Sequence, residues 1–435
     1  MKRIPSAAIK HHALGSLTLV ILLLSSWAWA TDGTQLTGIG AVQQGTCGTG
    51  VASPQDMTWV LLNPAGIIDL GCRLDINMEL FAPRRHNEPR GLFGNSRAGD
   101  MSDNGMFLIP SMGYSRSCGC GDYAWGIGLY GVSGMGVEYS DSRALWPRLF
   151  LKNYDRRTEY SVAQLAFAYA HTIGDTGWSV AIAPRLNYAM FKTDMMTLKF
   201  RNANAANEWD NAYGLGFSLG IYKRWERFGV GATYTSRQWM TDFEDYDDLF
   251  FESMDLPQMI QAGIAYDFTP QLEFVADYKW IDWSGVDQMS VTPIKGGFGW
   301  KDQHVFKVGL TWYALPKWTF RVGASHAKSP IDDKHVFANA LFPAVTEDHL
   351  SCGITYSINE KSDIHIAYTH AFKNTVRDSG GGDLFSKIGK GSKISLAENE
   401  ITIEYSYKFA GGACQMRREN WKKREYELNK GKGRF

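Results

Sequence analysis

Between residues 72 and 410 the sequence repeats one pattern, in which apolar and polar residues alternate over segment after segment. In the last segment, the odd positions of 401–409 are apolar or aromatic, while the even positions of 400–408 are polar or charged. Strict alternation predicts an extended strand whose two faces meet different surroundings. The pattern therefore predicts an all-β fold.

Fourteen such segments are predicted as strands. They cover roughly 72–82, 106–117, 123–139, 160–173, 177–193, 211–225, 228–240, 257–269, 271–283, 304–315, 318–330, 347–359, 362–375 and 398–410. An even count is what single-chain bacterial outer-membrane barrels show.

The connections between these strands alternate between long and short. The long ones are 83–105, 140–159, 194–210, 241–256, 284–303, 331–346 and 376–397. Short periplasmic turns and long outer loops are the asymmetry of outer-membrane barrels, and an even strand count leaves both termini in the periplasm. A soluble sandwich or propeller would bury the apolar face against another sheet, but it gives no reason for this alternation.

The first thirty residues predict a secretory signal peptide, 1–30. Lys2, Arg3 and Lys10 precede an apolar run over 14–24, and Ala28-Trp29-Ala30 has the small-x-small form of a cleavage site. A membrane anchor is the alternative, but the apolar run is short for one. We therefore expect a monomeric barrel in the outer membrane of a Gram-negative cell. Its expected partners are lipid, lipopolysaccharide and, during biogenesis, the barrel-assembly machinery.

Two segments lack the alternating pattern. Residues 31–71 are rich in glycine and small residues and directly precede the first strand. A barrel of fourteen strands has a lumen too wide for side chains to fill, so we predict that this segment plugs it as a hatch. Residues 411–435 hold eight basic and three acidic residues. This basic tail is predicted to be solvated in the periplasm, or to contact acidic headgroups or a partner.

Several function classes are disfavoured. The 45 basic and 45 acidic residues balance, which gives no nucleic-acid footprint. Five of the ten histidines, at 171, 304, 326, 365 and 370, are scattered along the strands, and no nucleophile–base constellation is visible, so no catalytic residue is predicted. Cys118-Gly-Cys120 lacks the second pair of a zinc site. We expect neither a metal nor a cofactor.

Eight tryptophans near predicted strand ends or loops are typical of interfacial girdles, although each also fits ordinary packing. They are Trp59, Trp146, Trp178, Trp225, Trp239, Trp283, Trp300 and Trp312.

One stretch carries a family resemblance. Asn63-Pro64-Ala65-Gly66, followed by Arg73-Leu74-Asp75 and by Glu79-Leu80-Phe81-Ala82-Pro83-Arg84-Arg85, resembles the FadL/TodX family. These are outer-membrane transporters of long-chain fatty acids and other hydrophobic compounds. The resemblance covers about 31–410, and the tail departs from it, since family chains usually end on the last strand.

The resemblance implies passive transport. Outer loops would catch a hydrophobic ligand, a lumenal pocket would bind it, and a rearranged hatch would release it through a lateral gap in the wall. Long-chain fatty acids are the leading substrate and aromatic hydrocarbons the alternative. A hydrophilic porin is disfavoured by the plug and the apolar loops, and a structural or adhesive barrel stays open.

The resemblance and the turn chemistry single out two elements. In Asn63-Pro64-Ala65-Gly66, asparagine before proline is held extended and glycine frees the next turn. The family places this hatch motif against the wall where the lateral opening forms, although a plain turn is the alternative. Within strand 123–139, interior glycines favour a kink, as at the family's side opening, or simply make room for neighbours. They are Gly126, Gly128, Gly131, Gly134 and Gly136.

Three cations on polar strand faces, Arg185, Lys307 and Arg321, are candidates to hold a carboxylate. An internal ion-pair network is the alternative, with Glu273, Asp277 and Lys279 as further members.

Two apolar loop clusters predict ligand capture or mutual packing. Their candidate residues are Leu145, Trp146 and Phe150 in one loop, and Phe243, Phe250 and Phe251 in another. Hairpin pairing also predicts a disulfide between Cys72 and Cys118, with Cys120 or Cys47 as alternative partners.

Overall fold

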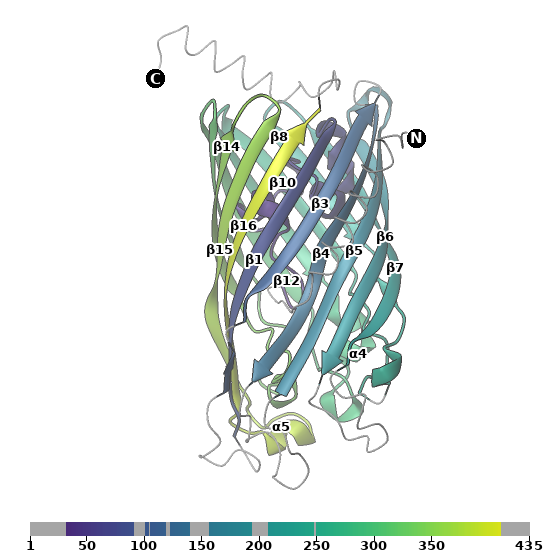
Figure 1. The fold of residues 1–435 in the computed structure, drawn as a ribbon, viewed down its shortest axis with the longest axis vertical. Helices are drawn as coiled ribbons and strands as arrows, with labels where there is room; N and C mark the ends of the chain where they lie inside the picture. The colour runs from purple at the N-terminus through teal and green to yellow at the C-terminus, as the bar shows by residue number, and fades with distance from the viewer. Residues whose placement is uncertain are drawn as a thin grey trace, which may run out of the picture.

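Fourteen antiparallel strands close into a barrel in the computed structural model, which describes residues 32–90, 101–103, 105–118, 122–139, 156–193, 208–247 and 249–409. Each strand pairs with its neighbours in sequence, and the last strand pairs with the first over sixteen residues (Figure 1). The strands are β1 Arg73–Glu88, β3 Phe107–Cys118, β4 Tyr123–Tyr139, β5 Arg156–Thr172, β6 Ser179–Thr193, β7 Asp210–Arg224, β8 Phe228–Thr235, β10 Met259–Thr269, β11 Leu272–Ile281, β12 Gln303–Leu315, β13 Trp318–His326, β14 Asp348–Ser357, β15 Ser362–Arg377 and β16 Lys393–Lys408. The predicted count and all-β class are confirmed.

Two short strands are added to the fourteen. β2 (Met101–Asp103) pairs with β1, and β9 (Trp239–Met240) pairs with β7. In the described part of the loops, the loop end also carries four 3-10 turns and two short helices. These are η4 Glu244–Tyr246, η5 Trp283–Gly285, α4 Asp287–Ser290, η6 Pro293–Lys295, η7 Phe337–Asn339 and α5 Leu384–Ile388. The short-turn end has η3 (Gly174–Thr176).

The predicted bounds of the first and last strands are wrong at the loop end. β1 continues to Glu88 and β16 begins at Lys393, where the two strands still pair. Outward positions there, such as His86 and Lys393, are polar and not apolar. A strand that extends beyond the hydrocarbon layer has no lipid to face, so it loses the alternation that reveals it in the sequence.

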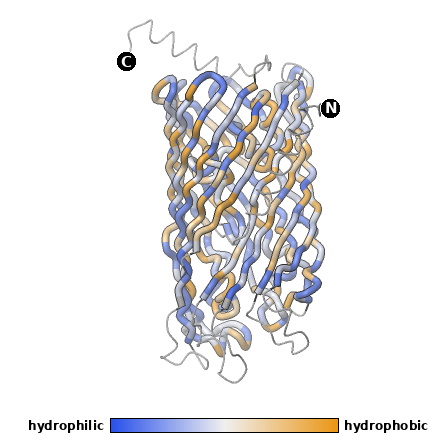
Figure 2. Tube along the Cα trace, in the orientation of Figure 1, coloured by the Kyte–Doolittle hydropathy of each residue, from blue (hydrophilic) through white to orange (hydrophobic). Residues whose placement is uncertain are grey.

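The two faces of each strand differ as the alternation predicts. On β1, Ile76 and Met78 are exposed on the outer surface, whereas Asp75 and Asn77 are buried inside. Figure 2 shows the same change from hydrophilic to hydrophobic along the strands. The barrel therefore presents its apolar side chains outward and its polar side chains to the lumen.

The lumen is occupied by residues 32–72, called the lumenal segment here. It contains α2 (Gly40–Gln44), α3 (Trp59–Leu62) and the 3-10 turn η1 (Pro64–Asp69). Between residues 32 and 70, every residue except Ile39, Gln55 and Asp69 is buried. The segment lies inside the end of the barrel that carries the short turns (Figure 1).

A second apolar core closes the loop end of the barrel. It joins loop residues such as Phe243, Trp283 and Trp300 to strand residues such as Phe191. Trp59, Trp283 and Trp300 are almost fully buried, so the prediction of an interfacial girdle is wrong for these three. No helix of the described residues is both long and apolar enough to span a bilayer.

Candidate functional site

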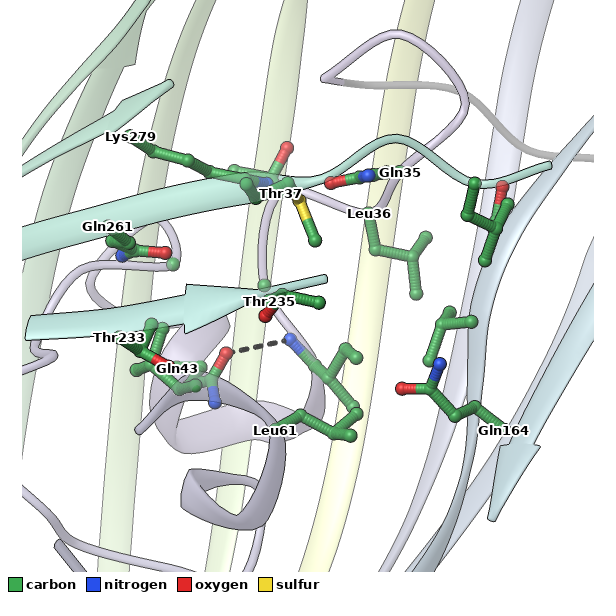
Figure 3. Close-up of a pocket in the computed structure, with 18 of the residues that line it drawn as sticks. Gln35, Leu36, Thr37, Gln43, Leu61, Gln164, Thr233, Thr235, Gln261 and Lys279 are labelled. Atoms are coloured by element: carbon green, nitrogen blue, oxygen red, sulfur yellow. Dashed lines mark hydrogen bonds between the residues drawn. The ribbon is translucent and has the colours of Figure 1, made fainter. Parts of the chain in front are cut away.

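A cavity of about 110 Å³ lies between the lumenal segment and the wall. Figure 3 shows Leu36 and Leu61 of the segment on one side of it and the polar wall residues Thr233, Gln261 and Lys279 on another. Within the segment, the side-chain oxygen of Gln43 accepts from the backbone N–H of Ile39 at 3.2 Å. The cavity is thus amphipathic, with an apolar portion and a polar rim.

Three cations line the cavity, and Arg185 is the one for which the described residues supply no acidic partner. Its guanidinium donates to the carbonyl of Leu61 at 2.8 Å, to Ser218 Oγ at 3.0 Å and to Gln164 Oε1 at 3.2 Å. Among the described residues, no carboxylate lies within ion-pair distance of it. A buried guanidinium held only by neutral acceptors keeps its full positive charge beside the cavity.

The other two predicted cations are engaged differently. Lys307 lines the cavity but pairs with Asp32 at 3.1 Å and donates to the carbonyl of Thr37 at 2.8 Å. Arg321 does not line the cavity and donates to Gln55 Oε1 at 2.8 Å and to Thr355 Oγ1 at 2.6 Å.

The acidic neighbours predicted for an ion-pair network mostly bind the lumenal segment. Asp277 Oδ2 accepts from the backbone N–H groups of Gly50 and Val51 at 2.8 and 3.0 Å. Glu273 Oε2 accepts from the hydroxyl of Ser53 at 3.0 Å, and its other oxygen pairs with Arg224 at 2.9 Å. Glu404, which the sequence did not single out, accepts from the N–H of Ala41 at 2.8 Å. Sequence reasoning missed this role, because a polar residue on the inner face signals only that it avoids lipid.

One genuine ion-pair network joins the segment to the wall. Asp32 pairs with Lys279 at 3.2 Å as well as with Lys307. Burial by itself would raise the pKa of Asp32, but the two ammonium groups outweigh it and lower that pKa to about 2.

Asn63 fastens the segment to the opposite strands. Its amide donates to the carbonyls of Val51 at 3.0 Å and Ile221 at 3.1 Å, and its oxygen accepts from the N–H of Ala65. The wall facing it is glycine at Gly220 and Gly231, where a Cβ would collide with Asn63. Asn63 therefore lies against β7 and β8, whereas η1, which holds the rest of the motif, packs against β5, β6 and β7 and also contacts β4 and β3. The gating role of the motif stays a prediction.

Pairing between β3 and β4 stops partway along the two strands. The two strands pair only between Met112–Cys118 and Tyr123–Leu129, and β4 then has a bulge between Gly131 and Ser133. An apolar pocket of about 350 Å³ lies beside this break. It is lined by outward residues such as Met78 and Ile403, and by Tyr130 from within the wall.

The glycines of β4 make room at this break. A Cβ on Gly131 would lie 2.6 Å from Ile109 Cγ2, and one on Gly126 would lie 3.0 Å from Val60 Cγ2. The N–H of Gly134 donates to the carbonyl of Thr34, and the carbonyl of Gly136 accepts from Arg85. β4 thus has a bulge, and two of its glycines leave space for neighbouring side chains; the role of these glycines in a lateral opening stays a prediction.

The described loop residues mostly pack on one another. Phe243 and Phe250 are buried, with ring centroids 5.5 and 4.9 Å from that of Phe191, while Phe251 is 43% exposed. Leu145, Trp146 and Phe150 lie outside the described residues, as do the signal segment and the basic tail.

The Cys72 thiol is free and donates to the carbonyl of Ser117 at 4.0 Å. The side chain of Cys118 is not among those that the structure describes, so the disulfide between Cys72 and Cys118 stays a prediction.

Among the described residues, three buried carboxylates lie as close together as the ligands of a metal ion. Asp56, Asp75 and Glu404 each offer a carboxylate oxygen within 4.8 Å of the others. Arg73 pairs with Asp75 at 2.8 Å, which removes part of the negative charge. Burial, and then the charge of Asp75, raises the pKa of Asp56 to about 6. Burial beside a second carboxylate therefore makes proton binding at Asp56 more favourable than at an isolated aspartate.

A closed barrel with an apolar outer face and a lumen filled by its own N-terminal residues defines an outer-membrane β-barrel. A family model described as outer membrane protein transport protein (OMPP1/FadL/TodX) matches residues 21–409. The chain belongs to this family, and hence to the transport proteins of the outer membrane and not to the enzymes.

Relatives and solved structures agree with this assignment. The chain is 24% identical over 144 residues to a long-chain fatty acid transport protein of Escherichia coli (strain K12), and 23% identical over 144 residues to one of Salmonella typhi. The first alignment covers 32% of each chain, and the second covers 32% of this chain and 33% of its relative. The chain thus matches about a third of the length of these relatives.

The fold resembles the Pseudomonas putida toluene transporter TodX, with a TM-score of 0.67 and 15% identity over 86% of this chain and 100% of that one. A Pseudomonas aeruginosa FadL homologue has a TM-score of 0.64 and 13% identity over 87% of this chain and 100% of its own.

Proposed function

We propose that the protein carries hydrophobic molecules passively across the outer membrane, and that its substrate is a long-chain fatty acid. The route runs from the loop end to the lumenal cavity, and then sideways between β3 and β4 into the bilayer. The observation that carries the substrate assignment is Arg185, a buried cation with no carboxylate partner among the described residues, which lines an otherwise amphipathic cavity.

A fatty acid complements this cavity chemically. Its carboxylate would accept two parallel hydrogen bonds from Arg185 and would neutralise a charge that the present neutral acceptors leave unpaired. Its alkyl chain would contact Leu36, Leu61 and Leu62 of the lumenal segment. Arg185 also donates to Leu61, so ligand binding would compete with a contact that holds the segment, which acts as a hatch.

The side pocket, through which the molecule would leave, is apolar, whereas the lumenal cavity is amphipathic. The pocket beside β3 and β4 is lined by Ile76, Met78, Leu129 and Ile403, which suits an alkyl chain and offers no cation for a carboxylate. A hydrophobic molecule that reaches it is already at the depth of the lipid, so it can leave without crossing water.

An aromatic hydrocarbon is the second candidate. The cavity of about 110 Å³ is close in size to the ~150 Å³ apolar cavity known to admit benzene. Such a ligand would not need the charge of Arg185.

Uptake by a deletion strain separates these candidates. Complementation with the wild type should restore uptake of labelled oleate, whereas the Arg185→Gln variant should restore it poorly. Arg321→Gln is the matched control, because Arg321 is a lumenal arginine that does not line the cavity. Toluene uptake that depends on the protein but not on Arg185 would favour the aromatic candidate. No dependence of either compound on the protein would leave a structural or adhesive barrel.

A further inference from the structure

At the loop end, β15, β16 and β1 continue together as a three-stranded extension (Figure 1). Arg377 of β15 lies opposite Lys393 of β16, which in turn lies opposite Glu88 of β1. On β15 and β16, the large apolar side chains exposed nearest to this end are Phe372 and Ile401. The extension therefore lies beyond the apolar outer face, on the side of the long outer loops.

The outward side of this extension is strongly basic. Its exposed or half-buried basic side chains are Arg84, Arg90, Lys373, Arg377 and Lys393. Among the described residues that point outward on the three strands, Glu88 is the acidic one. Five basic side chains and one acidic side chain give this surface, called the basic face here, a net charge of +4.

Most of this charge is not neutralised within the described part of the protein. Glu88 pairs with Lys393 at 2.8 Å and lies 3.7 Å from Arg90. For Arg84 and Arg377, the described residues supply no carboxylate within ion-pair distance. Arg377 and Lys393 are also directly opposite each other on neighbouring strands, and like charges in that position repel. An anion bound between them would relieve this repulsion.

We propose that the basic face binds the phosphate groups of lipopolysaccharide, the phosphorylated glycolipid of the outer leaflet. A guanidinium matches a phosphate with two parallel hydrogen bonds, and basic clusters beside a membrane bind anionic headgroups. The acyl chains of the same lipid would contact Phe372 and Ile401, which are 48% and 45% exposed. One lipid molecule would thus meet both the basic face and the apolar surface next to it.

The proposal does not depend on transport. Neither Arg84 nor Arg377 lines the lumenal cavity or the side pocket. A fatty acid is the other anion that could reach the basic face, but it carries one negative charge, whereas a lipid with several phosphates complements a net charge of +4 more fully.

Native mass spectrometry of the purified barrel in detergent tests the proposal by counting bound lipid A, the phosphorylated membrane anchor of lipopolysaccharide. Arg84→Gln/Arg377→Gln removes two exposed arginines and breaks no ion pair of the described residues. Its affinity for lipid A should be about thirtyfold lower than that of the wild type, because two basic side chains near the lipid surface are lost. Unchanged affinity would refute the proposed site.

The chain offers a matched control at the opposite end of the barrel. Arg116 of β3 and Arg227, between β7 and β8, are exposed at the short-turn end. Arg116→Gln/Arg227→Gln removes the same charge and should bind lipid A like the wild type. Equal weakening in both double variants would overturn the site in favour of a general attraction by charge. Heat-modifiable migration on gels shows that each barrel is folded.

The probe itself distinguishes phosphate recognition from other binding. Dephosphorylated lipid A should bind the wild type about as weakly as lipid A binds Arg84→Gln/Arg377→Gln, and equal binding of both forms by the wild type would contradict a phosphate site. Loss of oleate binding with retained lipid A binding in this variant would assign the basic face to the substrate instead. Oleate uptake by the variant should equal that of the wild type, so this test stands apart from that of the proposed function.

Discussion

Replacing Gly220 by alanine should loosen the lumenal segment from the wall. A Cβ at this position would lie 2.9 Å from the N–H nitrogen of Ala65 and closer still to Asn63 Oδ1, whereas ordinary contact begins at 3.4 Å. The turn must therefore retreat by at least about half an ångström. The atoms in the way belong to backbone or to a side chain held by three hydrogen bonds, so they cannot simply rotate aside.

The cost follows from the bonds that the retreat stretches. Asn63 donates to Val51 and Ile221 at 3.0 and 3.1 Å, and both bonds are near the end of their useful range after such a shift. At about 1 kcal/mol for each net hydrogen bond, the segment loses about 2 kcal/mol of local stability. That corresponds to about thirtyfold faster opening, since 1.4 kcal/mol is a factor of about ten.

Hydrogen–deuterium exchange of peptides covering 51–66 measures this opening directly, because exchange there requires the segment to leave the wall. Gly381→Ala is the control, since a Cβ there meets only Ser379 Oγ at 3.2 Å. In an Asn63→Ala background most of the effect of Gly220→Ala should vanish, because the main obstacle is gone. Additive effects of the two substitutions, or unchanged exchange in Gly220→Ala, would refute the steric argument.

Three further predictions concern other contacts of the described residues. Asp32→Asn leaves the ammonium groups of Lys279 and Lys307 buried without a carboxylate, which should cost about 3–5 kcal/mol and appear as faster exchange over 32–40. Neutralising Lys307 in the same chain should recover part of this loss. The raised pKa of Asp56, about 6, means that the folded segment binds a proton more tightly than the unfolded one, so protection should fall as pH rises from about 4 to 6. Asp56→Asn should flatten this dependence, and a rise in protection over the same range would contradict it. Phe250→Ala should cost about 3–5 kcal/mol in the loop core and make residues 241–256 sensitive to protease on intact cells.

The barrel could be predicted from the sequence because each strand residue responds to the lipid or the lumen directly beside it. A strand between lipid and lumen must alternate, as 400–409 does, and a barrel that is inserted from one side has turns of two lengths. The same logic failed at the ends of β1 and β16, where outward residues such as His86 meet no lipid.

The site depended on contacts that no local pattern encodes. Asn63 binds the carbonyl of Ile221, 158 positions away, and Glu404 binds the N–H of Ala41, 363 positions away. An inward polar residue has the same appearance in the sequence whether it binds a ligand, like the proposed Arg185, or holds the segment, like Asp277.

Alternation within the segments, together with the alternating lengths of their connections, determined that this chain forms a fourteen-stranded barrel with an apolar outer face, because each residue responds to the medium beside it. Only the tertiary structure decided which inner residues hold the lumenal segment, where its Asn63 turn docks and where the pairing of β3 with β4 ends. Those features arise where the lumenal segment meets strands that are distant from it in the sequence. Each depends on the shape and the hydrogen-bond geometry of the residues in contact.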